Sequence, residues 1–229
     1  IGTCNVLTWQ YSFLGSGIKY FKATAPNSTS ANGAFQSSSI EFLHGKLGSG
    51  SCTGQDLFKS SMITEIPSTF DMSGINRLTT SIYGSDIRSF GTVDAPVALK
   101  DGVVNQQFAR SCYHLREVNI SSGYFSGGVG FMFYQCDSLT AIRGLNGTAF
   151  TSLTSAFNQA YSLQTLESSN IAISFDLSTC NFATQGLVDI FNDLPSATAT
   201  ITITGNPGTA GLSAADLLIA TNKGWTVTT

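Results

Sequence analysis

Histidine and cysteine are the residue types in this chain with the most specific chemistry, and both are few. The 229 residues contain two histidines and five cysteines. His44 stands in the stretch EFLHGKLGSGSCTG, which lacks the G-x-x-x-x-G-K-[ST] spacing of a phosphate-binding loop and is therefore expected to be a flexible loop. His114 is expected at an exposed turn. Zinc binding is not expected, because the chain has no C-x-x-C pair.

The cysteines fall into two groups. Cys112 and Cys136 occupy equivalent positions of a recurring motif, which predicts buried, small apolar thiols. Cys4 and Cys52 lie in the less regular N-terminal part and are the better candidates for a disulfide bridge, although the sequence cannot supply the geometry that a bridge needs. Cys180 is expected to fill the core. The redox state of Cys4, Cys52 and Cys180 stays open.

Motifs for catalysis are absent from the sequence. There is no G-x-S-x-G nucleophile elbow and no H-E-x-x-H zinc helix. A carboxylate pair for glycoside cleavage stays open, because such pairs are assembled in space and the 14 acidic residues are widely scattered. We therefore expect no enzymatic activity, no cofactor and no metal, with a glycan-degrading enzyme as an alternative.

The elements that hold these residues repeat along the chain. In FMFYQCDSLTAIRGL the apolar residues lie three apart, which matches neither a strand, with its period of two, nor a helical stripe. The motif recurs with a constant period, starting at positions 112, 136 and 160, as Cys112-x-x-Leu115-x-x-Val118, Cys136-x-x-Leu139-x-x-Ile142 and Ala160-x-x-Leu163-x-x-Leu166. Such a period indicates stacked units, each of which is too small to bury its own apolar face. Residues 58–66 and 82–90 resemble earlier, degenerate copies.

The repeat Phe133-x-x-Cys136-x-x-Leu139-x-x-Ile142 resembles the core of the BspA-like leucine-rich repeats, over residues 105–170. Those repeats occur in bacterial and protist surface proteins and in bacteriophage virion proteins. The resemblance implies a β-rich α/β solenoid with rungs of about 24 residues, capped at both ends. Five or six rungs are expected. The last segment, ATITITGNPGTAGLSAADLLIATNKGWTVTT, resembles closing segments of phage tail and fibre proteins.

The terminal segments predict capping units. At the C-terminal end we expect a strand at residues 200–204, a helix at 213–223 with Ser213 as N-cap, and a last strand at Trp225. Residues 184–194 form an apolar helical stripe ended by Pro195. At the N-terminal end, residues 6–25 predict a β-hairpin turning at residues 15–17, and residues 26–39 predict an exposed loop.

The expected organisation is one elongated domain in three parts. Residues 1–50 form a β-rich cap and loop, residues 51–183 form the solenoid, and residues 184–229 form the helix and strand–helix–strand cap. The chain opens on Ile1 without a signal peptide, which indicates removal of an upstream segment or a start inside a longer product.

The repeat register predicts which side chains leave the core. Asn119, Arg143 and Glu167 are each one repeat apart and follow the buried position of each strand, and Arg143 and Glu167 are expected to pair across the sheet. Tyr124 and Phe125 stand between glycines in the stretch 123–128, and contact surfaces favour aromatic residues and arginine. These five residues are the candidates for contact with a partner: Asn119, Tyr124, Phe125, Arg143 and Glu167.

Composition favours an extracellular particle over a cytosolic enzyme. Only 11% of the residues are charged, against roughly 25% in ordinary soluble domains. The net charge of −3 predicts no nucleic-acid binding, and no apolar run reaches the ~18 residues of a membrane span. Together with the resemblance, this predicts a non-enzymatic bacteriophage tail or fibre protein in the virion. Its expected partners are other virion proteins or a host receptor such as a glycan, and it is expected to act as a homo-oligomer or as part of a larger assembly. Alternatives are a bacterial surface adhesin and a capsid decoration protein.

Overall fold

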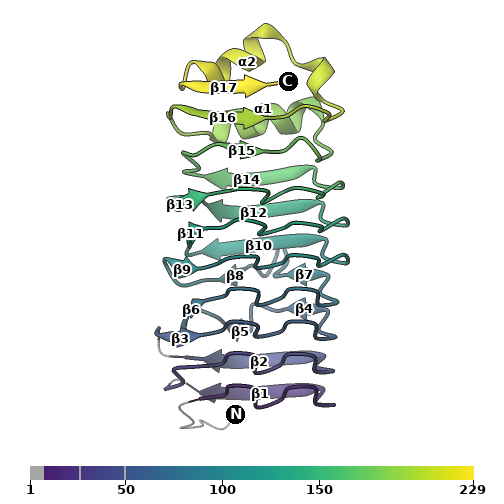
Figure 1. Cartoon of the computed structure of the whole chain (residues 1–229), viewed down its shortest axis with the longest axis vertical. Coiled ribbons are helices and arrows are strands. Elements are labelled where there is room, and N and C mark those ends of the chain that lie inside the picture. Colours follow the sequence, from purple (N-terminus) through teal and green to yellow (C-terminus); the bar gives the residue numbers. More distant parts are fainter. Residues whose placement is uncertain (1–7, 26, 49) are drawn as a thin grey trace.

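The computed structural model describes residues 8–25, 27–48 and 50–229. Its elements form layers that follow one another along a single long axis, from β1 at one end to α2 and β17 at the other (Figure 1). The fold is β-rich, with mostly parallel sheets and two α-helices. Neither helix within the described ranges has the length and the apolar run that crossing a bilayer requires.

The strands of the described residues belong to four sheets. The first sheet contains β1 (Tyr20–Ala25), β2 (Phe42–Leu47) and β5 (Phe70–Asp71). The second contains β4 (Glu65–Ile66), β7 (Ser89–Phe90), β10 (Glu117–Ser122), β12 (Ala141–Asn146) and β14 (Thr165–Ser169), with β8 (Val97–Ala98) beside β10. The third contains β3 (Cys52–Thr53), β6 (Ile75–Arg77), β9 (Val103–Val104), β11 (Phe125–Gly128) and β13 (Ala149–Ser152). The last contains β15 (Phe175–Asp176), β16 (Ala199–Thr202) and β17 (Trp225–Thr228).

A turn of constant conformation recurs along the described chain. In each copy two residues, four positions apart, have a positive φ, a conformation that costs an ordinary L-residue roughly 1–2 kcal/mol. There are seven such pairs: Tyr11 and Gly15, Gly33 and Ser37, Asp56 and Ser60, Thr80 and Gly84, Gln107 and Ser111, Phe131 and Gln135, and Ser155 and Gln159. Most of these residues are not glycine, so the surrounding structure must hold them in this conformation.

Backbone hydrogen bonds between layers hold these turns. Each of the first six turns donates three N–H groups to carbonyl oxygens of the next turn. In the sixth copy, the donors Phe131, Phe133 and Gln135 lie 3.0, 2.8 and 3.1 Å from the acceptors Thr154, Ala156 and Asn158. Because every second N–H of the turn points along the stack, the backbone is satisfied by its neighbours and not by water.

The apolar residues that lie three apart in the sequence form the core of the layers. Phe133, Leu139, Ile142 and Leu163 are fully buried, and Leu166 is almost fully buried. This confirms that the apolar positions of the repeat face the core. Equivalent side chains contact one another between layers. The rings of Phe35 and Phe58 are stacked 5.4 Å apart, and those of Phe133 and Phe157 6.1 Å apart. The core therefore runs continuously along the stack.

The predicted N-terminal hairpin is wrong. β1 pairs with β2 in parallel, residue for residue from Tyr20↔Phe42 to Ala25↔Leu47. Gly15 lies in the first copy of the recurring turn and donates its N–H to the Gln36 carbonyl at 2.9 Å. Two glycines flanking a serine resemble a hairpin turn in sequence, whereas here they lead into another layer.

The predicted exposed loop at residues 26–39 is also wrong, over its described part. Phe35 and Ser38 are fully buried, and the Phe35 ring is stacked 5.3 Å from that of Phe13. Serine replaces the cysteine of the later copies, and Ile40 follows it after two residues instead of three, so the sequence pattern is lost while the turn remains. The recurring turn occurs before residue 50, in the predicted N-terminal cap, as well as after it, in the predicted solenoid. The described residues contain seven such turns, whereas five or six repeating layers were expected.

The C-terminal elements agree with the predicted ones. α1 spans Thr184–Asp193, with Leu187, Ile190 and Phe191 buried, and it is followed by β16. A short 3-10 helix, η1 (Thr209–Gly211), leads to α2 (Ala214–Thr221), whose N-cap Ser213 forms a capping box with Asp216. β17 closes the last sheet, and its Trp225 Nε1 donates to the Pro195 carbonyl at 2.7 Å.

The histidines and cysteines are placed as follows. His44 lies in strand β2, so the flexible loop expected around it is wrong, whereas His114 is exposed at a turn as predicted. Cys112 and Cys136 are buried thiols, as predicted, and Cys52 and Cys180 are buried thiols as well. Cys4 lies outside the described residues, and with it the predicted bridge to Cys52.

Candidate contact surface

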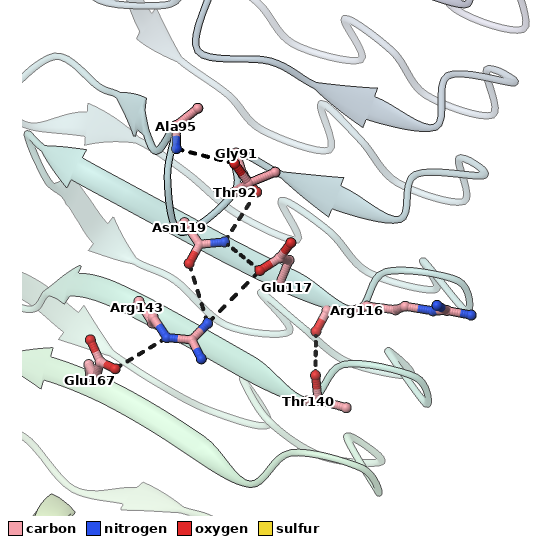
Figure 2. A network of polar contacts seen from close by, with 9 residues as sticks. All are labelled: Gly91, Thr92, Ala95, Arg116, Glu117, Asn119, Thr140, Arg143 and Glu167. Atoms are coloured by element: carbon pink, nitrogen blue, oxygen red, sulfur yellow. Dashed lines mark hydrogen bonds and ion pairs between the residues drawn. The ribbon is translucent and has the colours of Figure 1, made fainter.

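Three of the five predicted contact residues, Asn119, Arg143 and Glu167, lie in the neighbouring parallel strands β10, β12 and β14. The register pairs Glu117 with Ala141 and Ala141 with Thr165, and it pairs Asn119 with Arg143. The constant repeat spacing therefore aligns these positions, as predicted. Figure 2 shows the resulting polar network, with Arg143 between the two glutamates.

Arg143 is the centre of this network. Its Nε lies 3.2 Å from Glu167 Oε1, which confirms the predicted pair, and its Nη1 lies 4.0 Å from Glu117 Oε2. Nη1 also donates to Asn119 Oδ1 at 3.4 Å. The Arg143 side chain is 31% exposed and that of Glu167 is 61% exposed. An ion pair with this exposure contributes little stability, roughly 0–1 kcal/mol.

Asn119 differs from the expectation, because it is buried. Its Nδ2 donates to the Gly91 carbonyl at 3.1 Å and to Glu117 Oε2 at 3.0 Å. The segment after β7, part of which Figure 2 shows beside Asn119, covers it. Thr92 and Ala95 close a turn through mutual backbone hydrogen bonds, and β8 then pairs with β10. This layer is longer than the others, since the turn residues Thr80 and Gln107 lie 27 apart.

The two aromatic residues at 124 and 125 also differ from one another. Phe125 is buried in strand β11, and its ring lies 5.3 Å from that of Phe108. Tyr124 and Phe125 were expected either to contact a partner or to pack back on their own layer, and for Phe125 the second holds, because it is buried and inaccessible to a partner. Tyr124 is half-buried, and its carbonyl accepts the Val103 N–H at 2.9 Å. Of the five candidates, Tyr124, Arg143 and Glu167 present side-chain surface to solvent.

The network neutralises the charge of Arg143 but keeps one negative charge in excess. Two carboxylates share one guanidinium, so Arg143 is not free to recruit an anionic ligand, and hydrogen bonds to its neighbours hold Asn119 in place. Among the residues that the structure describes, no group of three or more His, Cys, Asp and Glu side chains could hold a metal ion.

A cation–aromatic cluster lies on the turn side of the stack and was not predicted. The Arg110 guanidinium carbon lies 5.2, 5.4 and 5.9 Å from the ring centres of Tyr134, Phe131 and Tyr83. Lys59 Nζ lies 5.6 Å from the Tyr83 ring. Within ~6 Å such contacts are attractive. Lys59, Tyr83, Arg110 and Tyr134 occupy one equivalent position of successive turns, so aligning all seven turns in the sequence would have revealed the cluster.

Comparison of the chain with protein-family models, with curated proteins and with solved structures finds no match.

Proposed function

We propose that the chain is a leucine-rich-repeat-like solenoid whose layers are the rungs and whose last sheet, with α1 and α2, is a cap. The parallel register between equivalent strands of successive repeats supports this, as does the hydrogen-bonded column of turns. Each rung then contributes one residue to each of several stripes that run along the outside. Such a surface presents a broad, rigid array of side chains.

We further propose that the protein is a non-enzymatic virion component, a bacteriophage tail or fibre protein that contacts a host receptor or other virion proteins. The proposal depends on the resemblance of residues 105–170 and of the terminal segment, and the single observation that supports it is the continuous stack closed by α2 and β17 (Figure 1). A long stack with a saturated backbone suits a load-bearing part of a particle.

The location can be tested by immunogold electron microscopy with antibodies against the purified chain, on cultures that carry its gene. Labelling of tails or fibres on released particles is expected. Labelling of the bacterial envelope alone would favour the surface adhesin instead. Labelling of capsids would favour a capsid decoration protein. Release of reducing sugar from host glycans by the purified chain would contradict the non-enzymatic function.

The contact role of two accessible candidates, Tyr124 and Arg143, can be tested separately. Tyr124→Ser and Arg143→Ala should reduce attachment of particles to host cells, or incorporation into particles, at least severalfold, because contact surfaces derive most of their binding energy from a few such side chains. Tyr161→Ser is the matched control, since Tyr161 is 55% exposed on another side of the layer. Unchanged attachment and incorporation in both variants would end the role of this surface.

A further inference from the structure

A cavity opens where the regular succession of strands is interrupted. In the preceding layers β9, β11 and β13 are neighbours in one sheet and pair in parallel. β15 is the next strand on this side, but it pairs with β16 and belongs to the terminal sheet (Figure 1). The separation leaves a shallow cavity of about 480 Å³ that is largely open to solvent, lined by residues 151–155 on one side and by residues 173–176, Thr200 and Thr202 on the other.

The lining is rich in hydroxyl groups held in place by hydrogen bonds. The hydroxyls of Ser152 and Thr154 lie 2.8 Å apart, and the Ser174 hydroxyl accepts the Thr200 N–H at 2.9 Å. Asp176 Oδ1 accepts the Ser178 N–H at 2.7 Å. Each of these groups keeps further hydrogen-bonding capacity, because a hydroxyl both donates and accepts and a carboxylate has four acceptor positions.

The column of turns also ends at this cavity. The sixth turn donates three backbone N–H groups to the seventh, whereas the seventh donates one, from Gln159 to the Thr179 hydroxyl at 2.9 Å. Within the described ranges, no backbone acceptor continues the column from Ser155, which lines the cavity. Its N–H is therefore a fixed donor available to an oxygen atom of a ligand.

Charge and shape restrict the class of ligand. Asp176 is the one charged residue of the lining, so an anion would be repelled and would meet no cation. Thr200 and Thr202 point outward, because Ile201 between them is buried in the core, so the ligand lies on the face of the sheet and does not extend its edge as a peptide strand would. Leu153 and Ile173 add apolar surface among the polar groups.

We propose that this cavity binds a neutral saccharide, with the hydroxyl groups and Asp176 bonded to the sugar hydroxyls and the apolar residues against the C–H face of the ring. The volume lies within the range of small-molecule sites, roughly 300–1,000 Å³. The inference goes beyond the proposed function and does not depend on it, since a saccharide site would stand whether the chain belongs to a particle or to a cell surface.

The test uses the purified full chain and a fixed panel of probes, by saturation-transfer NMR and calorimetric titration. The neutral probes are the methyl glycosides of glucose, galactose, mannose, N-acetylglucosamine and N-acetylgalactosamine, and the anionic probes are glucuronate and N-acetylneuraminate. Saturable binding of at least one neutral probe is expected, with no binding of the anionic ones. Absence of saturable binding by all neutral probes, or binding of anions alone, overturns the proposal.

Two variants locate the site. Thr202→Trp should fill the cavity and abolish binding, while Thr64→Trp is the matched control, because Thr64 is exposed, precedes a strand and lies outside this cavity. Asp176→Asn keeps a side-chain oxygen that can accept the Ser178 N–H, and it should weaken the binding of neutral probes at least tenfold. This variant tests the site even if Thr202→Trp fails to fold. Undiminished binding in Asp176→Asn, or in folded Thr202→Trp, contradicts the assignment.

Discussion

At the scale of single residues, stability depends on ladders of equivalent side chains that no single layer could bury. Leu139 is fully buried, and Leu115 and Leu163 hold the same position one layer before and one layer after. A side chain in the middle of such a ladder loses contacts on both sides when it is shortened. We expect Leu139→Ala to lower the free energy of unfolding by roughly 2–5 kcal/mol, measured by denaturant titration.

The control for this substitution is Leu218→Ala in helix α2. Leu218 is 53% exposed, and alanine suits a helix at least as well as leucine does, so a change below about 1 kcal/mol is expected. Equal losses in the two variants would show that Leu139 does not belong to a continuous core.

Buried thiols make stability depend on pH in the alkaline range. Burial raises the pKa of Cys112 to about 12, and it raises the pKa of Cys136 well above its usual range. An unfolded thiol ionises near pH 8.5, so above that pH the unfolded chain has lost protons that the folded chain retains. The free energy of unfolding should therefore fall as the pH rises from about 8.5 towards 12, by up to about 1.4 kcal/mol per pH unit for each such thiol.

The double variant Cys112→Ala/Cys136→Ala isolates this contribution from that of tyrosine and lysine. Alanine already stands at the equivalent position 160, so the variant should fold. Its unfolding free energy, measured between pH 7 and 10.5, should fall less steeply than that of the wild-type chain. Identical slopes would mean that these thiols ionise in the folded protein as readily as in the unfolded one.

At the scale of elements, a glycine bulge shapes strand β12. The register between β12 and β14 shifts between Ile142 and Leu145, and Gly144 in this interval has a φ of +74°. A Cβ atom there would overlap the backbone carbonyl of Ile120 in β10. We expect Gly144→Ala to lower the unfolding free energy by more than the roughly 1–3 kcal/mol of backbone strain alone, measured as a shift of the denaturation midpoint.

Two other glycines separate strain from overlap. Gly127 in β11 has a φ of +85° but open space around it, and Gly17 has open space without a positive φ. Gly127→Ala should therefore show the cost of strain alone, and Gly17→Ala should be close to neutral or slightly stabilising. A loss in Gly144→Ala no larger than that in Gly127→Ala would argue against the close approach of β10 and β12.

The elements that could be predicted from the sequence have signals within their own segment, whereas the elements that were missed depend on neighbouring layers. The helices at Thr184–Asp193 and Ala214–Thr221 were predictable from signals within each segment: the apolar stripe ended by Pro195 for the first, and the Ser213–Asp216 capping box for the second. The turn containing Phe35 and Ser38 was missed because its identity depends on the layers beside it, which supply the hydrogen bonds that hold positive φ values. The covering of Asn119 by the segment after β7 depends on a local lengthening of the chain, which the repeat pattern does not encode.

At the scale of the whole molecule, the stack needs an end. The terminal sheet replaces the regular layers, and the rings of Phe157 and Phe175, 6.4 Å apart, join it to the last recurring turn. Within the terminal elements the Phe175 and Trp225 rings lie 5.9 Å apart, and Lys223 Nζ donates to the carbonyls of Phe191 and Asn192 at 3.0 and 2.7 Å. β17 also pairs with β16 along four residues. The closing segment therefore covers both apolar side chains and a strand edge.

Removal of residues 205–229 tests this closing role. The truncated chain would expose the edge of β16, together with the core side chains that Trp225 and Ala220 cover. Because an uncovered strand edge templates the addition of further chains and solenoid arrays depend on polar terminal units, we expect aggregation and a lower unfolding temperature, measured by light scattering and circular dichroism. The matched control is Ser213→Ala, which weakens only the N-cap of α2, by roughly 0.5–2 kcal/mol, and should leave the protein dispersed. A truncated chain that remained monomeric and as stable as the full chain would mean that the layers below β16 close the stack by themselves.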